Sequence, residues 1–80
     1  MNAHTHPPAN SALNLKHGED GVIVELRGDE SQILALMQLG FTPGTTISRR
    51  QAGAFGDPIS YSVRGTRVAL RRDEAVCLIL

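Results

Sequence analysis

Histidine, carboxylate and thiol side chains are the groups in this 80-residue chain that could do chemistry, and they are scattered along it. His4 and His6 are separated by one residue, so both imidazoles could reach one transition-metal ion in an extended segment. A closed zinc site needs about four ligands, and none follows at a fixed spacing. His17 and Glu19 form a second surface candidate, able to hold Zn²⁺ or Fe²⁺ at a contact between molecules. We expect incidental histidines rather than a designed site, and no required cofactor.

The remaining residues do not form an enzyme motif. Cys77 has apolar neighbours and no adjacent His or Lys to stabilise a thiolate, which predicts a buried, unreactive thiol. The sequence contains no glycine-rich phosphate-binding loop and no Ser–His–Asp order. A single small domain also has little room for an enclosed active site. The sequence therefore predicts a protein that is not an enzyme.

Charge is divided unevenly, although the net charge is zero. Before Gly40 there are five acidic and two basic residues, and after it there are six arginines and three acidic residues. An anionic partner for the second half is one interpretation, and solvated arginines on strand faces are the other. Nucleic-acid binders are usually basic overall and offer aromatic side chains for stacking, whereas this chain has one Tyr, two Phe and no Trp. We do not expect nucleic acid as a partner.

The N-terminal segment predicts a flexible tail. Residues 1–12 are polar, contain proline and lack periodicity, so we expect the domain to span residues 13–80. This segment does not resemble a signal peptide, and no apolar run approaches the roughly 20 residues that cross a bilayer. A cytoplasmic protein that is not embedded in a membrane is expected.

The segment at residues 22–27 alternates and is rich in β-branched residues, which predicts a strand with Val22, Val24 and Leu26 on one face. A short helix is predicted to follow it. Asp29 can cap this helix, and Gln32 can complete a capping box. One helix face is expected to comprise Ile33, Leu36, Met37 and Gly40. Gly40 also suits the left-handed residue at a helix end, and Pro43 prevents continuation.

From Gly44 onward every pattern favours strands. Alternating or apolar segments predict strands at residues 45–50, 59–63, 66–71 and 76–80. The connections are a loop containing two glycines, a tight turn at Arg64–Gly65 and one turn at residues 71–75. Five short strands, with one helix between the first and second, predict a mainly β protein that forms a small closed or partly open barrel.

Three segments together resemble the FeoA family of bacterial ferrous iron transport proteins. They are LMQLGFTPG at residues 36–44, GDPISYSVRGTRVALR at 56–71 and EAVCLIL at 74–80. The resemblance extends from Leu13 to Leu80. The matching positions, to which it gives structural roles, include Gly40, Pro43, Gly44, Gly56, Pro58 and Gly65.

The resemblance implies an SH3-like five-stranded barrel. It also implies that this barrel binds the cytoplasmic region of the FeoB membrane transporter and supports or modulates ferrous iron uptake. The contact set expected from loop position and charge is Phe55, Asp57, Tyr61, Arg49 and Arg50. Phe55 is expected either to anchor a partner or to pack against the barrel end. The alternative function is a transition-metal-binding module, or an accessory domain like the SH3-like domain of iron-dependent repressors. Weak or metal-mediated self-association is a further expectation.

Overall fold

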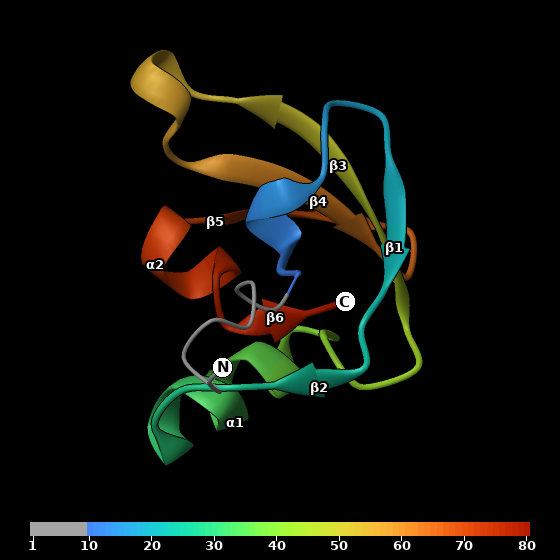
Figure 1. Ribbon diagram of the computed structural model, residues 1–80, viewed down its shortest axis with the longest axis vertical. Helices are drawn as coiled ribbons and strands as arrows, with labels where there is room; N and C mark the ends of the chain where they lie inside the picture. Colours follow the sequence, from blue (N-terminus) through green and yellow to red (C-terminus); the bar gives the residue numbers. More distant parts are fainter. Residues whose placement is uncertain (1–9) are drawn as a thin grey trace, which may run out of the picture.

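The computed structural model describes residues 10–80, and its strands form two antiparallel sheets accompanied by short helices (Figure 1). One sheet has the strand order β1-β3-β4-β5, with β1 (Asp20–Val22), β3 (Thr46–Ala52), β4 (Ile59–Val63) and β5 (Thr66–Leu70). The other pairs β2 (Glu25–Leu26) with β6 (Leu78–Ile79). The helices are η2 (Ala12–Asn14), α1 (Glu30–Gln38), η3 (Ala54–Gly56) and α2 (Arg72–Ala75). The mainly β architecture is confirmed, although the two sheets do not close into one continuous barrel.

The strand predicted at residues 22–27 is divided between the two sheets. Val22 pairs with Thr46 in the larger sheet, whereas Glu25 pairs with Ile79 in the smaller one. At the bend between them, Ile23 is fully buried, while Val22 and Val24 are 49% and 59% exposed. The prediction of one strand, with Val22 and Val24 on a common face, is therefore wrong, because the bend divides residues 22–27 between two sheets.

Helix α1 begins and ends as its sequence predicts. The Asp29 carboxylate accepts a hydrogen bond of 2.9 Å from the Gln32 N–H, and the Gln32 side chain accepts from the Asp29 N–H. At the other end Gly40 adopts a φ of 107°, and the Phe41 N–H donates to the Leu36 carbonyl oxygen. Glycine occupies this left-handed position without a Cβ clash. This geometry turns the fully buried Phe41 side chain into the core.

The core lies between the sheets and is centred on β4. Ile59, Tyr61 and Val63, which alternate along this strand and therefore share one face, are all buried. A two-residue turn at Arg64 and Gly65, both with positive φ, leads directly into β5, and this tight turn is also confirmed. The other large side chains that are completely buried are Phe41, Ile23, Ile47, Leu70 and Leu78.

Both ends of the described chain differ from prediction. Ser11 and Ala12, assigned to the tail, are buried, and Ser11 forms a bridge with Ile79. The folded region therefore begins before residue 13. The last strand is shorter than predicted, because Val76 ends α2 with 47% of its surface exposed and only Leu78–Ile79 form β6.

Candidate partner-binding surface

The loop between β3 and β4 holds Phe55 out in solvent. Phe55 is fully exposed and has a φ of 62°, a left-handed conformation that costs a non-glycine residue about 1–2 kcal/mol. Three backbone hydrogen bonds hold the loop around it. The Gly53 N–H donates to the Pro58 oxygen at 2.7 Å, the Gly56 N–H to the Gly53 oxygen at 2.9 Å, and the Asp57 N–H to the Ala54 oxygen at 3.4 Å. Of the two positions expected for this ring, the structure shows the exposed one.

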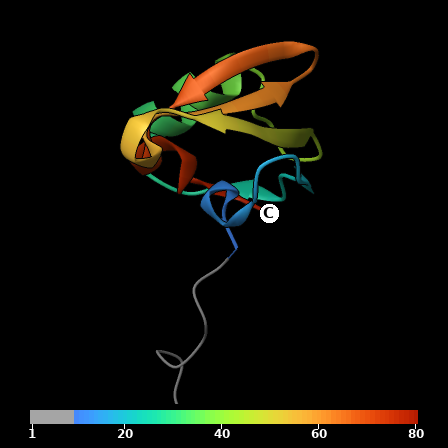
Figure 2. The same ribbon diagram turned by 90° about the horizontal axis from the view of Figure 1, so that it is seen from above.

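Helix α2 braces the same loop from the side. The Arg72 N–H donates to the Asp57 Oδ1 at 3.1 Å, and the Arg72 guanidinium lies 3.5 Å from the Gly56 carbonyl oxygen. In both views η3 and α2 lie on the left side of the molecule (Figures 1 and 2). Asp57 is exposed, but one of its carboxylate oxygens serves this internal contact. The loop is therefore a constrained platform for Phe55.

Tyr61, which was expected to contact a partner, is a core residue. Its side chain is completely buried, and its hydroxyl donates to the Ala12 carbonyl oxygen at 2.9 Å. Burial raises the pKa of Tyr61 above its ordinary value, although the positive charges of Arg49 and Arg72 act in the opposite direction. The expectation was wrong because alternation identifies a residue's face of a strand but not which face the second sheet covers.

The two neighbouring arginines of β3 are half-buried. Arg49 donates from Nη1 to the Leu15 carbonyl oxygen at 2.7 Å, so its head group is engaged inside the protein. Arg50 alternates with Arg49 along β3 and makes no side-chain hydrogen bond within residues 10–80. Among the five expected contact residues, only the side chains of Phe55 and Arg50 therefore make no hydrogen bond within residues 10–80.

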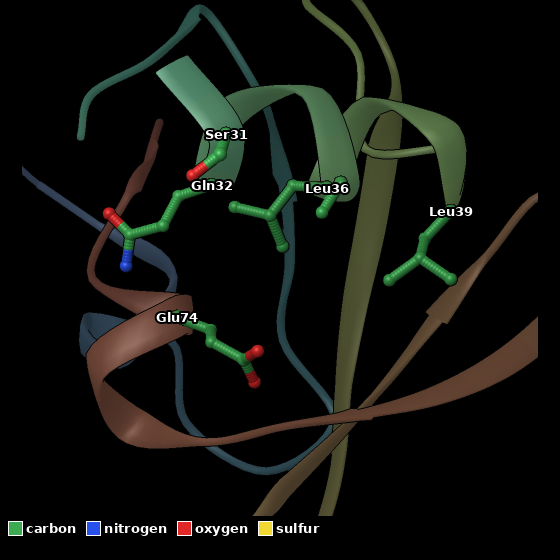
Figure 3. Close-up of a pocket in the computed structure, with 6 residues that line it drawn as sticks. Ser31, Gln32, Leu36, Leu39 and Glu74 are labelled. Carbon is green, nitrogen blue, oxygen red and sulfur yellow. The ribbon is translucent and has the colours of Figure 1, made fainter. Parts of the chain in front are cut away.

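A shallow hollow between α1 and α2 was not anticipated. It has a volume of about 240 Å³, and Figure 3 shows side chains from both helices directed toward it. Its lining residues are Ser31, Gln32, Ala35, Leu36, Leu39 and Glu74. Leu34 and Leu39 are 56% and 50% exposed, and they lie outside the helix face that the sequence predicts to be buried. Of these two leucines only Leu39 lines the hollow, and this apolar residue beyond the predicted face was the available indication of it.

Of the candidate metal ligands, His17 and Glu19 lie within the part of the chain that the structure describes. His4 and His6 lie outside the described residues. His17 is exposed in a turn, where the Glu19 carboxylate accepts a hydrogen bond of 2.7 Å from the Lys16 N–H. Within residues 10–80 there is no cluster of three His, Cys, Asp or Glu side chains suited to a metal. Cys77 is buried, and burial raises the pKa of its thiol, as expected for an unreactive cysteine.

Known proteins resemble this chain over nearly its whole described length. A model of the FeoA domain matches residues 12–79. A fusion protein of Fe²⁺ transport protein A and the Fe²⁺ transporter FeoB from Porphyromonas gingivalis is 33% identical over 61 residues, covering 76% of this chain and 7% of that protein. The chain therefore spans only a small part of this curated relative.

Two solved structures share the fold. The zinc complex of Stenotrophomonas maltophilia FeoA, described as an SH3 domain protein, has a TM-score of 0.78 and 25% identity, covering 89% of this chain and 88% of that one. A manganese-dependent transcriptional repressor has a TM-score of 0.80 and 18% identity, covering 95% of this chain and 38% of that one. The SH3-like fold is thereby confirmed, and the likeness to the repressor concerns the fold alone.

Proposed function

This chain belongs to the FeoA family, and we propose that it is an accessory protein of ferrous iron uptake that binds a FeoB transporter and supports or modulates its activity. The Porphyromonas gingivalis relative, in which the FeoA and FeoB parts share one chain, is the observation that carries the proposal. Covalent linkage keeps two domains at high effective concentration. Where the two parts are separate chains, association requires a dedicated surface.

The contact surface that we propose for FeoB is the loop between β3 and β4. Aromatic side chains that insert into a partner commonly dominate the binding energy of an interface. Phe55 is fully exposed, and hydrogen bonds around it and to α2 hold its loop before any partner arrives. Such preorganisation reduces the entropy lost on binding. Arg50 is the second member of the proposed surface, and Asp57 supports the loop.

The experiment is a binding titration of the full chain against the purified cytoplasmic region of FeoB. Phe55→Ala is expected to weaken binding about tenfold or more while leaving the melting temperature nearly unchanged, because the ring contacts no core residue. Leu34→Ala is the matched control, since it removes an exposed apolar side chain from α1. Loss of affinity only in the Leu34 variant would move the contact to α1, and no binding by wild type would refute the FeoB proposal.

We propose that this role is exercised on the cytoplasmic side and by contact, without catalysis of its own. Among residues 10–80, no helix combines the length and apolar character that a membrane crossing requires. Reconstituted FeoB gives the direct measurement. Its turnover is expected to change on addition of this chain, and the Phe55→Ala variant is expected to reduce that change in proportion to its lost affinity.

Transition-metal binding is the second proposed function, favoured by the zinc complex of the Stenotrophomonas maltophilia protein. Calorimetry of the wild-type chain with Zn²⁺ or Fe²⁺ tests it, with His17→Ala as the variant. Stoichiometric binding by the monomer would support a metal-carrying module. Binding that appears only together with self-association would indicate a surface ion between molecules, and absence of heat would reject the function.

A further inference from the structure

Within residues 10–80, strand β5 forms an edge of the larger sheet and is paired on one side only, with β4 (Figure 2). The two-residue turn at Arg64–Gly65 makes Val63 and Thr66 a hydrogen-bonded pair, and such pairs recur at every second residue of an antiparallel ladder. The backbone groups of Thr66, Val68 and Leu70 therefore face β4. Those of Arg67 and Ala69 face away from the sheet.

These outward backbone groups are free within residues 10–80. No backbone or side-chain group of the described chain bonds to the N–H or carbonyl oxygen of Arg67 or Ala69. The next outward donor, the Arg71 N–H, is occupied, because it donates to the Glu74 Oε1 at 2.8 Å. The part of the β5 edge that can pair with another strand is thus short, and it ends where α2 begins.

The side chains along this edge carry positive charge. Arg67, Ala69 and Arg71 are all exposed, and their alternate spacing places them on the outer face of β5, because Arg71 is still extended at φ −70° and ψ 157°. Within the described residues the single ion pair joins Arg27 to Glu25, so neither edge arginine has an acidic partner. Ala69, which lies between the two arginines on this face, carries only a methyl group. The opposite face of β5 carries Val68 and Leu70, which are partly and fully buried.

A second copy of β5 fits this edge poorly. If a second copy of β5 paired through these outward groups, the register would decide which residue neighbours Arg67. Depending on the register, Arg67 would lie opposite Arg67 of the copy, opposite Arg71 of the copy, or diagonal to Arg67 of the copy. Like charges on neighbouring strands destabilise pairing, and charged edge residues are a common protection against self-association. The same charges favour an incoming strand of opposite sign.

We propose that the β5 edge binds an extended acidic segment of another protein as an added strand. The backbone of this segment forms hydrogen bonds with the backbone groups of Arg67 and Ala69. Two acidic side chains of the segment, four positions apart, face Arg67 and Arg71. At a strand rise of about 3.3 Å per residue, these acids are roughly 13 Å apart. Apolar residues at the alternate positions of the added segment lie on the other face of the sheet, which carries Val68. This interaction goes beyond the proposed function, since it uses a different element from the Phe55 loop and requires no transporter.

The experiment uses the full ¹⁵N-labelled chain and a short synthetic peptide with two glutamates four positions apart and valines at the alternate positions. The expected result is saturable binding, with the largest amide shifts and the strongest protection from hydrogen exchange at Arg67 and Ala69. The same peptide with lysines in place of the glutamates is expected not to bind. Equal binding of both peptides, or shifts centred elsewhere, would overturn the proposal.

Two pairs of variants separate the backbone and charge contributions. Arg67→Glu is expected to weaken binding of the acidic peptide about tenfold or more and to strengthen binding of the lysine peptide. Arg27→Glu is the charge-matched control. Ala69→Pro removes an outward N–H that the β4 ladder does not use, so it is expected to abolish binding while Ala69→Ser retains it. If Ala69→Pro does not fold, the Arg67 pair decides the outcome. Tight binding of a short single-stranded oligonucleotide, without protection of these amides, would also refute a peptide edge.

Discussion

The Tyr61 hydroxyl donates a hydrogen bond of 2.9 Å to the Ala12 carbonyl oxygen and joins two residues 49 positions apart in the sequence. This contact ties the central strand β4 to η2 at the beginning of the described chain. It explains why Tyr61 is a structural residue and why the folded region extends before residue 13.

Replacing Tyr61 with Phe is expected to lower the free energy of unfolding by about 1 kcal/mol. The loss is moderate because the Ala12 carbonyl oxygen also accepts from the Leu15 N–H at 3.2 Å. Denaturant unfolding at neutral pH measures it, with Ser62→Ala as a nearby control on the other face of β4. An unchanged midpoint would show that the buried hydroxyl contributes nothing to stability.

The stability difference between wild type and Tyr61→Phe is expected to depend on pH in the alkaline range. Burial holds the pKa of Tyr61 above the value of about 10 that a tyrosine has in an unfolded chain. Above pH 10 the unfolded state releases this proton more readily, so stability falls as pH rises toward the folded pKa. The difference in stability between wild type and Tyr61→Phe should therefore diminish above pH 10. A difference that stays constant to higher pH would contradict the assignment.

Asp29 is expected to make α1 sensitive to acid. Hydrogen bonds from the Gln32 N–H and the Ser31 side chain lower the pKa of this carboxyl. Its stabilising effect is present above the unfolded-state pKa and is lost as pH falls through the folded value. Asp29→Ala should lower the melting temperature by a few degrees at pH 7, whereas Asn should retain the cap and lose only its acid dependence. Thermal scans between pH 2 and 7 distinguish the three proteins, and identical profiles would reject this role.

Gly40→Ala is expected to destabilise the fold by about 1–2 kcal/mol. Space is not the reason, because an added Cβ would meet its nearest neighbour, the Arg64 Cδ, at an ordinary 3.5 Å. The backbone φ of 107° is the reason, since a residue with a Cβ rarely adopts it. Gln38→Ala, in the exposed last turn of α1, should change stability by less than about 0.5 kcal/mol. Urea unfolding of both variants makes the comparison, and equal losses would contradict it.

Phe55→Gly is expected to be about 1 kcal/mol more stable than Phe55→Ala, because alanine inherits the left-handed backbone of Phe55 and glycine accepts it without strain. Both variants lack the ring, so both should lose affinity for FeoB. Parallel unfolding and binding titrations separate the two effects. Equal stabilities of the two variants would show that the loop relaxes when the ring is removed.

Local features of this protein could be predicted from the sequence by itself. The Asp29 capping box, the helix end at Gly40 and the Arg64–Gly65 turn depend on residues within a few positions of one another. The alternation in β4 likewise predicted a strand with Ile59, Tyr61 and Val63 on one face, although not that this face is buried. These features are determined locally because capping bonds, turn dihedrals and side-chain alternation are properties of a short stretch of backbone.

Only the tertiary structure decided which of these elements meet. It divides residues 22–27 between two sheets, covers Tyr61 with η2 and leaves Phe55 exposed beside α2. It also leaves the Arg67 edge of β5 unpaired within the described chain. The reason is that burial and strand pairing depend on contacts between residues far apart in the sequence, and these are formed together when the two sheets pack around one core.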